Sequence, residues 1–155
     1  MPSNTVPPLS LYVHLPWCVQ KCPYCDFNSY SGGDDASRHR YLDALCRDIE
    51  AEAARAGSRP LVSIFLGGGT PCLFRADEID RLLEVTRSHL ACTVDIEITM
   101  ETNPGAVEPG DLRGYRDAGV NRLSVGAQSF DAGKLATLGR IHGVDDIGAT
   151  VKEAV

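Results

Sequence analysis

Three cysteines crowd into one short segment of the chain, as Cys18, Cys22 and Cys25 in the sequence CVQKCPYC. Cysteine thiolates are the ligands that zinc and iron–sulfur centres prefer in proteins. Pro23 interrupts any regular helix through the segment, so the three thiols can converge from a loop. The segment also follows a predicted strand, at the rim where ligands gather in α/β folds. The spacing therefore predicts a metal site.

The number of ligands bears on which metal this site holds. A structural zinc ion takes four protein ligands in a closed site. A fourth ligand could come from His14, His39 or a distant cysteine, but no second CxxC pair follows. A [4Fe-4S] cubane held by three cysteines keeps one iron open for a cofactor or substrate. The spacing favours an iron–sulfur cluster, with zinc and a set of ordinary core cysteines as the alternatives.

The chain has six cysteines in all, a number that could form disulfides in a small secreted protein. The N-terminal sequence MPSNTVPPLS lacks the basic start and apolar core of a signal peptide. We therefore expect a cytoplasmic protein, in which a cysteine cluster is more often a metal site. We expect Cys46 and Cys92 to pack as small buried side chains. Cys72 should pack as well, because a fourth protein ligand would close the open iron.

Strands and helices are expected to alternate along the sequence. Residues 94–100 alternate strictly between apolar and polar side chains, which is typical of a strand. The predicted strands are 9–15, 61–66, 94–100 and 122–126. The predicted helices are 37–56, 77–90, 109–118, 131–138 and a segment from 145 onward. This order predicts an α/β fold with a parallel sheet, either open or part of a barrel.

Candidate binding groups follow the second and third predicted strands. The glycines at 67–69 leave the backbone open to a ligand, and no lysine follows as it does in a phosphate-binding loop. An amino group would instead use the carbonyls, and a plain tight turn is the alternative. Glu101 stands just past the third strand, where a carboxylate can bind a cationic or hydroxylated ligand. Glu97 and Asp95 share its face, and a solvated strand end is the alternative.

The order CxxxCxYC, with Tyr24 before the last cysteine, resembles the signature of the radical S-adenosylmethionine (SAM) superfamily. The longer segments LYVHLPWCVQKCPYCDFNSY, FLGGGTPCLF, ETNPG and GVNRLSVGAQSFDAGKLATLGRIH are similar to oxygen-independent coproporphyrinogen III oxidases and to the related haem chaperones. The resemblance runs from Leu11 to His142. It covers nearly the whole chain and is very specific.

This resemblance implies a [4Fe-4S] cluster on Cys18, Cys22 and Cys25, with SAM bound at the cluster. In the oxidases, the positions of Gln128 and Arg140 contact a second SAM. The residues that match cofactor-binding positions of the family are Tyr12, Tyr24, Gly68, Gly69, Thr70, Glu101, Gln128 and Arg140.

The fold implied by the resemblance is a partial (β/α) barrel of about six units, followed by a C-terminal domain. We expect residues 1–8 to form a lead-in and residues 9–155 to form a truncated radical SAM core, with about four of those units. The last residues, ATVKEAV, lie in a helix without a stop signal. We therefore expect a piece of a longer protein, poorly stable alone because its last strand is an unpaired edge.

One position departs from the oxidase pattern. The oxidases carry a further cysteine two places after the third, and Phe27 stands there in this chain. The CDFNS run instead looks like the haem chaperones, which bind haem and transfer it to acceptor proteins. The alternative is an oxidase that decarboxylates porphyrinogen propionates by means of a 5′-deoxyadenosyl radical. The resemblance also implies an electron donor for the cluster.

Charge and hydropathy exclude some other partners. The net charge of −6 and the pI of about 5.1 give no electrostatic reason to expect a nucleic acid or an anionic membrane, because phosphates are bound through Lys and Arg. The longest apolar stretches are far shorter than the roughly 20 residues of a membrane span.

Overall fold

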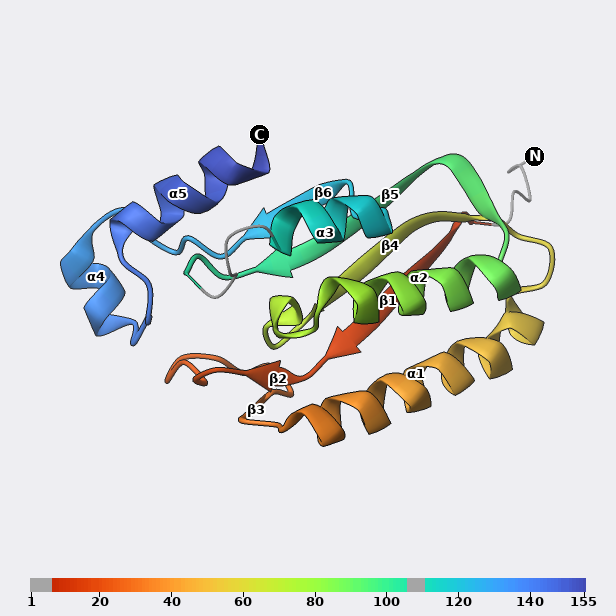
Figure 1. The fold of residues 1–155 in the computed structure, drawn as a ribbon, viewed down its shortest axis with the longest axis horizontal. Coiled ribbons are helices and arrows are strands. Elements are labelled where there is room, and N and C mark those ends of the chain that lie inside the picture. The colour runs from red at the N-terminus through yellow and green to blue at the C-terminus, as the bar shows by residue number, and fades with distance from the viewer. Residues whose placement is uncertain (1–6, 106–110) are drawn as a thin grey trace, which may run out of the picture.

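The computed structural model describes residues 7–105 and 111–155 of the chain. Four parallel strands form one sheet in the order β1-β4-β5-β6, and their carboxyl ends point toward the same end of the molecule (Figure 1). These strands are β1 (Leu9–Leu15), β4 (Leu61–Gly68), β5 (Cys92–Thr102) and β6 (Arg122–Val125). The helices are α1 (Asp35–Ala56), α2 (Ala76–His89), α3 (Asp111–Ala118), α4 (Ala132–Thr137) and α5 (Val144–Ala154).

The predicted alternation of strands and helices is confirmed, and so is the parallel sheet. The second strand was expected to end at residue 66 but continues through Gly67 and Gly68, because these glycines pair with His14 and Leu15 of β1. Strand pairing thus overrides the weak strand preference of glycine. The third strand is also longer than expected, so Glu101 lies inside β5 rather than past it. The expected helix start at 109 and most of the expected lead-in lie outside the described residues.

Two small elements were not predicted. The short strands β2 (Trp17–Cys18) and β3 (Tyr30–Ser31) pair in parallel on either side of the cysteine segment. A 3-10 helix, η1 (Pro71–Leu73), follows the glycine run. Two-residue strands and single turns leave no periodic pattern in a sequence, so hydrophobic spacing could not reveal them.

The core lies between one face of the sheet and helices α1, α2 and α3. Alternate residues of neighbouring strands point to this face, as Val13, Leu66 and Met100 do in register. The helices contribute apolar side chains at helical spacing, including Leu42 on α1 and Leu82 on α2. The elements β2, β3, α4 and α5 lie toward the end of the molecule to which the strands point (Figure 1).

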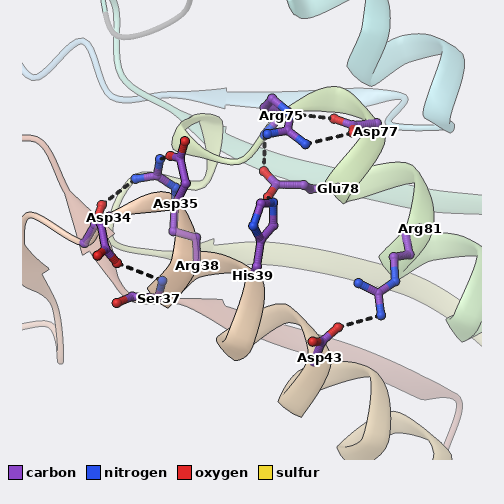
Figure 2. Close-up of polar contacts among 11 residues, drawn as sticks. Asp34, Asp35, Ser37, Arg38, His39, Asp43, Arg75, Asp77, Glu78 and Arg81 are labelled. Atoms are coloured by element: carbon purple, nitrogen blue, oxygen red, sulfur yellow. Dashed lines mark hydrogen bonds and ion pairs between the residues drawn. The ribbon is translucent and has the colours of Figure 1, made fainter.

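Polar contacts join the N-terminal halves of α1 and α2, as Figure 2 shows. Asp34 caps α1 by accepting a hydrogen bond from the Ser37 N–H at 2.8 Å, and the hydrogen bonds from Ser37 lower the pKa of its carboxyl group. Glu78 is buried on α2. One of its carboxylate oxygens lies 3.0 Å from His39 Nε2 on α1, and the other accepts the N–H of Arg75 at 2.7 Å. These contacts fix the helix starts that follow the cysteine segment and the glycine run.

The glycine run packs directly on the chain that leads into the cysteine segment. The Gly69 N–H donates to the Leu15 carbonyl at 2.8 Å, and the Thr70 N–H donates to the Trp17 carbonyl at 2.7 Å. A Cβ atom on Gly69 would lie 2.5 Å from the Trp17 oxygen and 2.8 Å from the Pro16 oxygen. No side chain fits there, so the close backbone approach itself requires glycine.

A second anchor comes from α3. Tyr115 is buried, and its hydroxyl donates to the Phe74 carbonyl at 2.7 Å and lies 3.1 Å from the Cys72 carbonyl. Both carbonyls belong to the turn that follows the glycine run. Helix α3 therefore holds this turn through the Tyr115 hydroxyl.

We expect Gly69→Ala to lower the free energy of unfolding by about 1–3 kcal/mol, the usual cost of overpacking. The new methyl group would push apart the two backbones that meet there. Urea denaturation followed by circular dichroism measures the effect. Gly148→Ala is the control, because a Cβ on this α5 residue meets no atom within 4 Å. Equal stability of Gly69→Ala and the wild type would contradict the close approach.

We expect Tyr115→Phe to lower the free energy of unfolding by about 1–2 kcal/mol, because buried carbonyls lose their hydrogen-bond donor. The matched control is Tyr30→Phe, which removes an exposed hydroxyl bonded only to Asn28 Oδ1 among the described contacts. This control should stay within about 0.5 kcal/mol of the wild type. Thermal unfolding of both variants under one buffer condition compares them. A loss in Tyr30→Phe as large as in Tyr115→Phe would refute the role of the α3 anchor.

Candidate metal and cofactor site

A cleft of about 310 Å³ opens at the carboxyl ends of the strands. Its walls come from the cysteine segment, the glycine run, the ends of β5 and β6, and the loop after α4. Of the candidate site residues predicted from the sequence, those that line the cleft are Cys18, Cys22, Cys25, Tyr24, Gly68, Gly69, Thr70, Glu101, Gln128 and Arg140. Parallel strands deliver these residues to one edge although they are distant in sequence.

Tyr12 is the predicted residue that the structure does not place among the cleft-lining residues. It lies on β1, with its ring stacked on Phe65 at a centroid distance of 6.2 Å. Its hydroxyl lies 2.9 Å from His14 Nδ1. Partial burial, together with the nearby Glu101 carboxylate, raises the pKa of this hydroxyl. Tyr12 therefore belongs to the sheet face next to the cleft, and a contact with the cofactor stays a prediction.

The cysteine segment is held as a compact loop. Cys18 is buried on β2, whereas Cys22 and Cys25 are partly exposed and are joined by a turn from the Cys25 N–H to the Cys22 carbonyl at 3.0 Å. The Lys21 ammonium group donates to the Phe27 carbonyl at 3.0 Å and to the Ser29 carbonyl at 3.3 Å. Lys21 thus ties the cysteine-bearing part of the loop to its return toward β3.

The three thiols suit an iron–sulfur cluster, because cysteine thiolates are the ligands that such clusters prefer. All are free and all line the same cleft. Across residues 7–105 and 111–155, no three His, Cys, Asp or Glu side chains are grouped closely enough for a single metal ion. A cubane does not need such a group, because each thiolate binds a different iron. Glu101 and Gln128 line the same cleft as the three cysteines.

Glu101 links β5 to the glycine run. Its Oε2 accepts the Gly68 N–H at 3.1 Å, and its side chain lines the cleft. Glu97 lies further back on the strand, bonded to Thr99 at 3.0 Å. Neither Glu97 nor Asp95 lines the cleft. Of the three carboxylates considered from the sequence, Glu101 alone is placed to meet a ligand.

Asn103 lines the cleft but was not predicted as a site residue. It directly follows β5, and its amide nitrogen donates to Thr70 Oγ1 at 3.1 Å. Its amide oxygen accepts from Arg140 Nη2 at 2.6 Å. Asn103 therefore joins two predicted site residues that lie far apart in sequence. The sequence feature that could have identified Asn103 as a site residue is its position as the first polar residue after a strand end.

In the part of the chain that the structure describes, two buried polar atoms of cleft-lining residues have no hydrogen-bond partner. Thr102 is buried and lines the cleft, and its hydroxyl oxygen has no hydrogen-bond partner in the described part of the chain. The same holds for Nε of Arg140. Buried polar groups normally find a partner, so these two atoms fit a cleft that receives a polar ligand.

Gln128 and Arg140 complete the far wall of the cleft. Gln128 has φ of +61°, a left-handed conformation that is uncommon for a residue other than glycine and is found at functional sites. Arg140 reaches across the cleft to Cys22. His142, to which the sequence assigned no role, is buried, with its Nδ1 3.5 Å from Arg140 Nη2.

The remaining cysteines pack, as expected. Cys46 and Cys72 are buried in the core, and Cys92 packs against it at the start of β5. Burial raises the pKa of the Cys46 and Cys92 thiols and so disfavours their thiolate forms.

Among the described helices, none combines the length and apolar character needed to cross a membrane.

Known proteins resemble the chain over nearly its whole length. It is 48% identical over 149 residues to the haem chaperone HemW of Escherichia coli. This aligned region covers 96% of this chain and 39% of that protein. It is 40% identical over 149 residues to a mitochondrial radical S-adenosyl methionine domain-containing protein 1 of Bos taurus, covering 94% of this chain and 33% of the relative. The chain thus spans about two fifths or less of the length of these relatives.

A solved structure has the same fold. The coproporphyrinogen III oxidase HemN of Escherichia coli, described as a radical SAM enzyme, superimposes with a TM-score of 0.87 and 33% sequence identity, over 95% of this chain and 34% of that one. The predicted α/β fold, a partial barrel of the radical SAM type, is confirmed by this match. Residues 12–155 match the family described as the Radical SAM superfamily. The chain therefore belongs to the radical SAM superfamily.

Proposed function

We propose that this protein is a haem chaperone that holds a [4Fe-4S] cluster on Cys18, Cys22 and Cys25 and binds SAM beside it. The observation that carries the proposal is the convergence of the three thiols, the glycine run and Glu101 on one cleft. Residues 9–155 would form the radical SAM core of the protein. We expect it to work in the cytoplasm, where its thiols stay reduced.

The hydrogen bonds of the glycine run favour an amino group as its ligand. The N–H groups of Gly68, Gly69 and Thr70 donate to Glu101, Leu15 and Trp17, so they are not free to bind an anion. The Glu101 carboxylate lines the cleft beside them. A carboxylate next to a turn without free donors suits the amino group of a bound SAM better than a phosphate. When bound, the cluster would supply electrons to SAM from a low-potential donor.

Phe27 favours the chaperone over the oxidase. Its ring lines the cleft and is 61% exposed, at the position where the oxidases carry a further cysteine. Two curated relatives at 48% and 47% identity are haem chaperones, whereas the oxidase structure is 33% identical in sequence. The fold supports the oxidase as the alternative, with coproporphyrinogen as substrate. In the chaperone, haem passes to acceptor proteins.

We expect Cys18→Ala, Cys22→Ala and Cys25→Ala each to abolish iron binding and the absorbance near 400 nm after anaerobic reconstitution. Each thiolate binds a different iron, so the loss of one opens a second corner of the cubane. Cys46→Ala is the control and should keep full absorbance, because Cys46 packs in the core on α1. Stoichiometric zinc and no iron in the wild type would refute the proposed [4Fe-4S] cluster.

An assay of haem transfer distinguishes a haem chaperone from a coproporphyrinogen oxidase. The full-length protein should bind haem and pass it to an apo-haemoprotein, detected by the acceptor's Soret band. With coproporphyrinogen III, SAM and a reductant under anaerobic conditions, it should form no protoporphyrinogen IX. Turnover of coproporphyrinogen without haem transfer would refute the chaperone and establish the oxidase.

A further inference from the structure

We propose that Arg140 is a positioning residue that raises the reduction potential of the cluster by donating a hydrogen bond to the ligand sulfur of Cys22. This inference rests on the proposed cluster. It differs from a contact between Arg140 and SAM, because the bond to sulfur is present in the protein alone. Arg140 Nη1 lies 3.3 Å from Cys22 Sγ, within hydrogen-bond range for a sulfur acceptor.

The backbone brings Arg140 to the cysteine segment by a close approach of two loops. Gly139, the residue before it, has φ of +66°. A Cβ atom on Gly139 would lie 2.8 Å from Cδ of Pro23, which is the residue after Cys22. Glycine therefore supplies both the left-handed turn and the space that this contact needs. The loop after α4 is packed against the cysteine segment itself.

Further contacts aim the guanidinium group, among them one of 3.5 Å between Nη2 and His142 Nδ1. Arg140 Nη2 donates to Asn103 Oδ1 at 2.6 Å and to the Gly126 carbonyl at 3.1 Å. Nη1 also lies 3.5 Å from the Tyr24 hydroxyl. The guanidinium group is planar, so hydrogen bonds that fix one of its terminal nitrogens leave little freedom in the position of the other. Nη1 is thus directed at the Cys22 sulfur by acceptors at the ends of β5 and β6.

The direction of the effect follows from charge. A cubane with three thiolates carries net negative charge, and one-electron reduction by a low-potential donor adds one more. A fixed cation beside a ligand sulfur stabilises the reduced state more than the oxidised state. Hydrogen bonds to the sulfurs also set the potentials of such clusters. Arg140 should therefore make the cluster easier to reduce.

The test is a redox titration of the reconstituted full-length protein, followed by EPR and carried out without SAM. Arg140→Gln should shift the midpoint potential to a more negative value, and Arg140→Lys should shift it less, because lysine keeps the charge without the planar guanidinium group. Asn103→Ala, which frees the guanidinium, should shift it in the same direction.

Arg122→Gln is the matched control, because it removes an equal charge from an exposed residue on β6 that pairs with Glu97 outside the cleft. An unchanged potential in Arg140→Gln, or an equal shift in Arg122→Gln, would overturn the inference. If Arg140→Gln binds no cluster, the midpoint potential of Arg140→Lys tests the inference instead. Loss of iron in both variants would also overturn the inference, because Arg140 would then be needed for cluster assembly. A wild type without a cluster would instead refute the proposed function, and this inference with it.

Discussion

The site depends on one close approach of two backbones. The chain leaving β4 lies directly on the chain leaving β1, with room for no side chain at Gly69. Two backbone hydrogen bonds, to Leu15 and Trp17, close the contact. Cys18 follows immediately on one side and Thr70 on the other. The distance between the cysteine segment and the glycine run is therefore set by main-chain packing, which side-chain motion cannot relax.

The rest of the site is assembled around this contact by residues that bridge separate strand ends. Glu101 ties β5 to Gly68, and Asn103 ties the end of β5 to Thr70 and Arg140. Each bridge joins segments that are distant in sequence, so the site can form only when the sheet has formed. Polar contacts between α1 and α2 (Figure 2) hold the same end of the sheet. Helix α3 adds the hydrogen bond from Tyr115 to the Phe74 carbonyl.

Local pattern and the family resemblance predicted the alternation of strands and helices, the parallel sheet and most of the cleft-lining residues, because apolar periodicity and motif spacing are properties of short segments. They did not reveal the contacts of Asn103 with Thr70 and Arg140, which join distant segments, or the two-residue strands β2 and β3, which leave no periodic pattern. Strand pairing likewise explains why β4 continues into Gly67 and Gly68. Tyr12 matches a cofactor-binding position of the family but is not among the residues that line the cleft. A matching motif position therefore does not by itself place a side chain in the cleft.

In the proposed site, three thiolates would hold a cluster whose fourth iron is open to SAM at the edge of the sheet. The most direct measurement is the EPR spectrum of the anaerobically reconstituted, reduced protein, recorded with and without SAM. We predict a [4Fe-4S]⁺ signal that changes when SAM is added. A cluster signal that SAM leaves unchanged would contradict the claim, as would a protein that binds zinc and shows no signal.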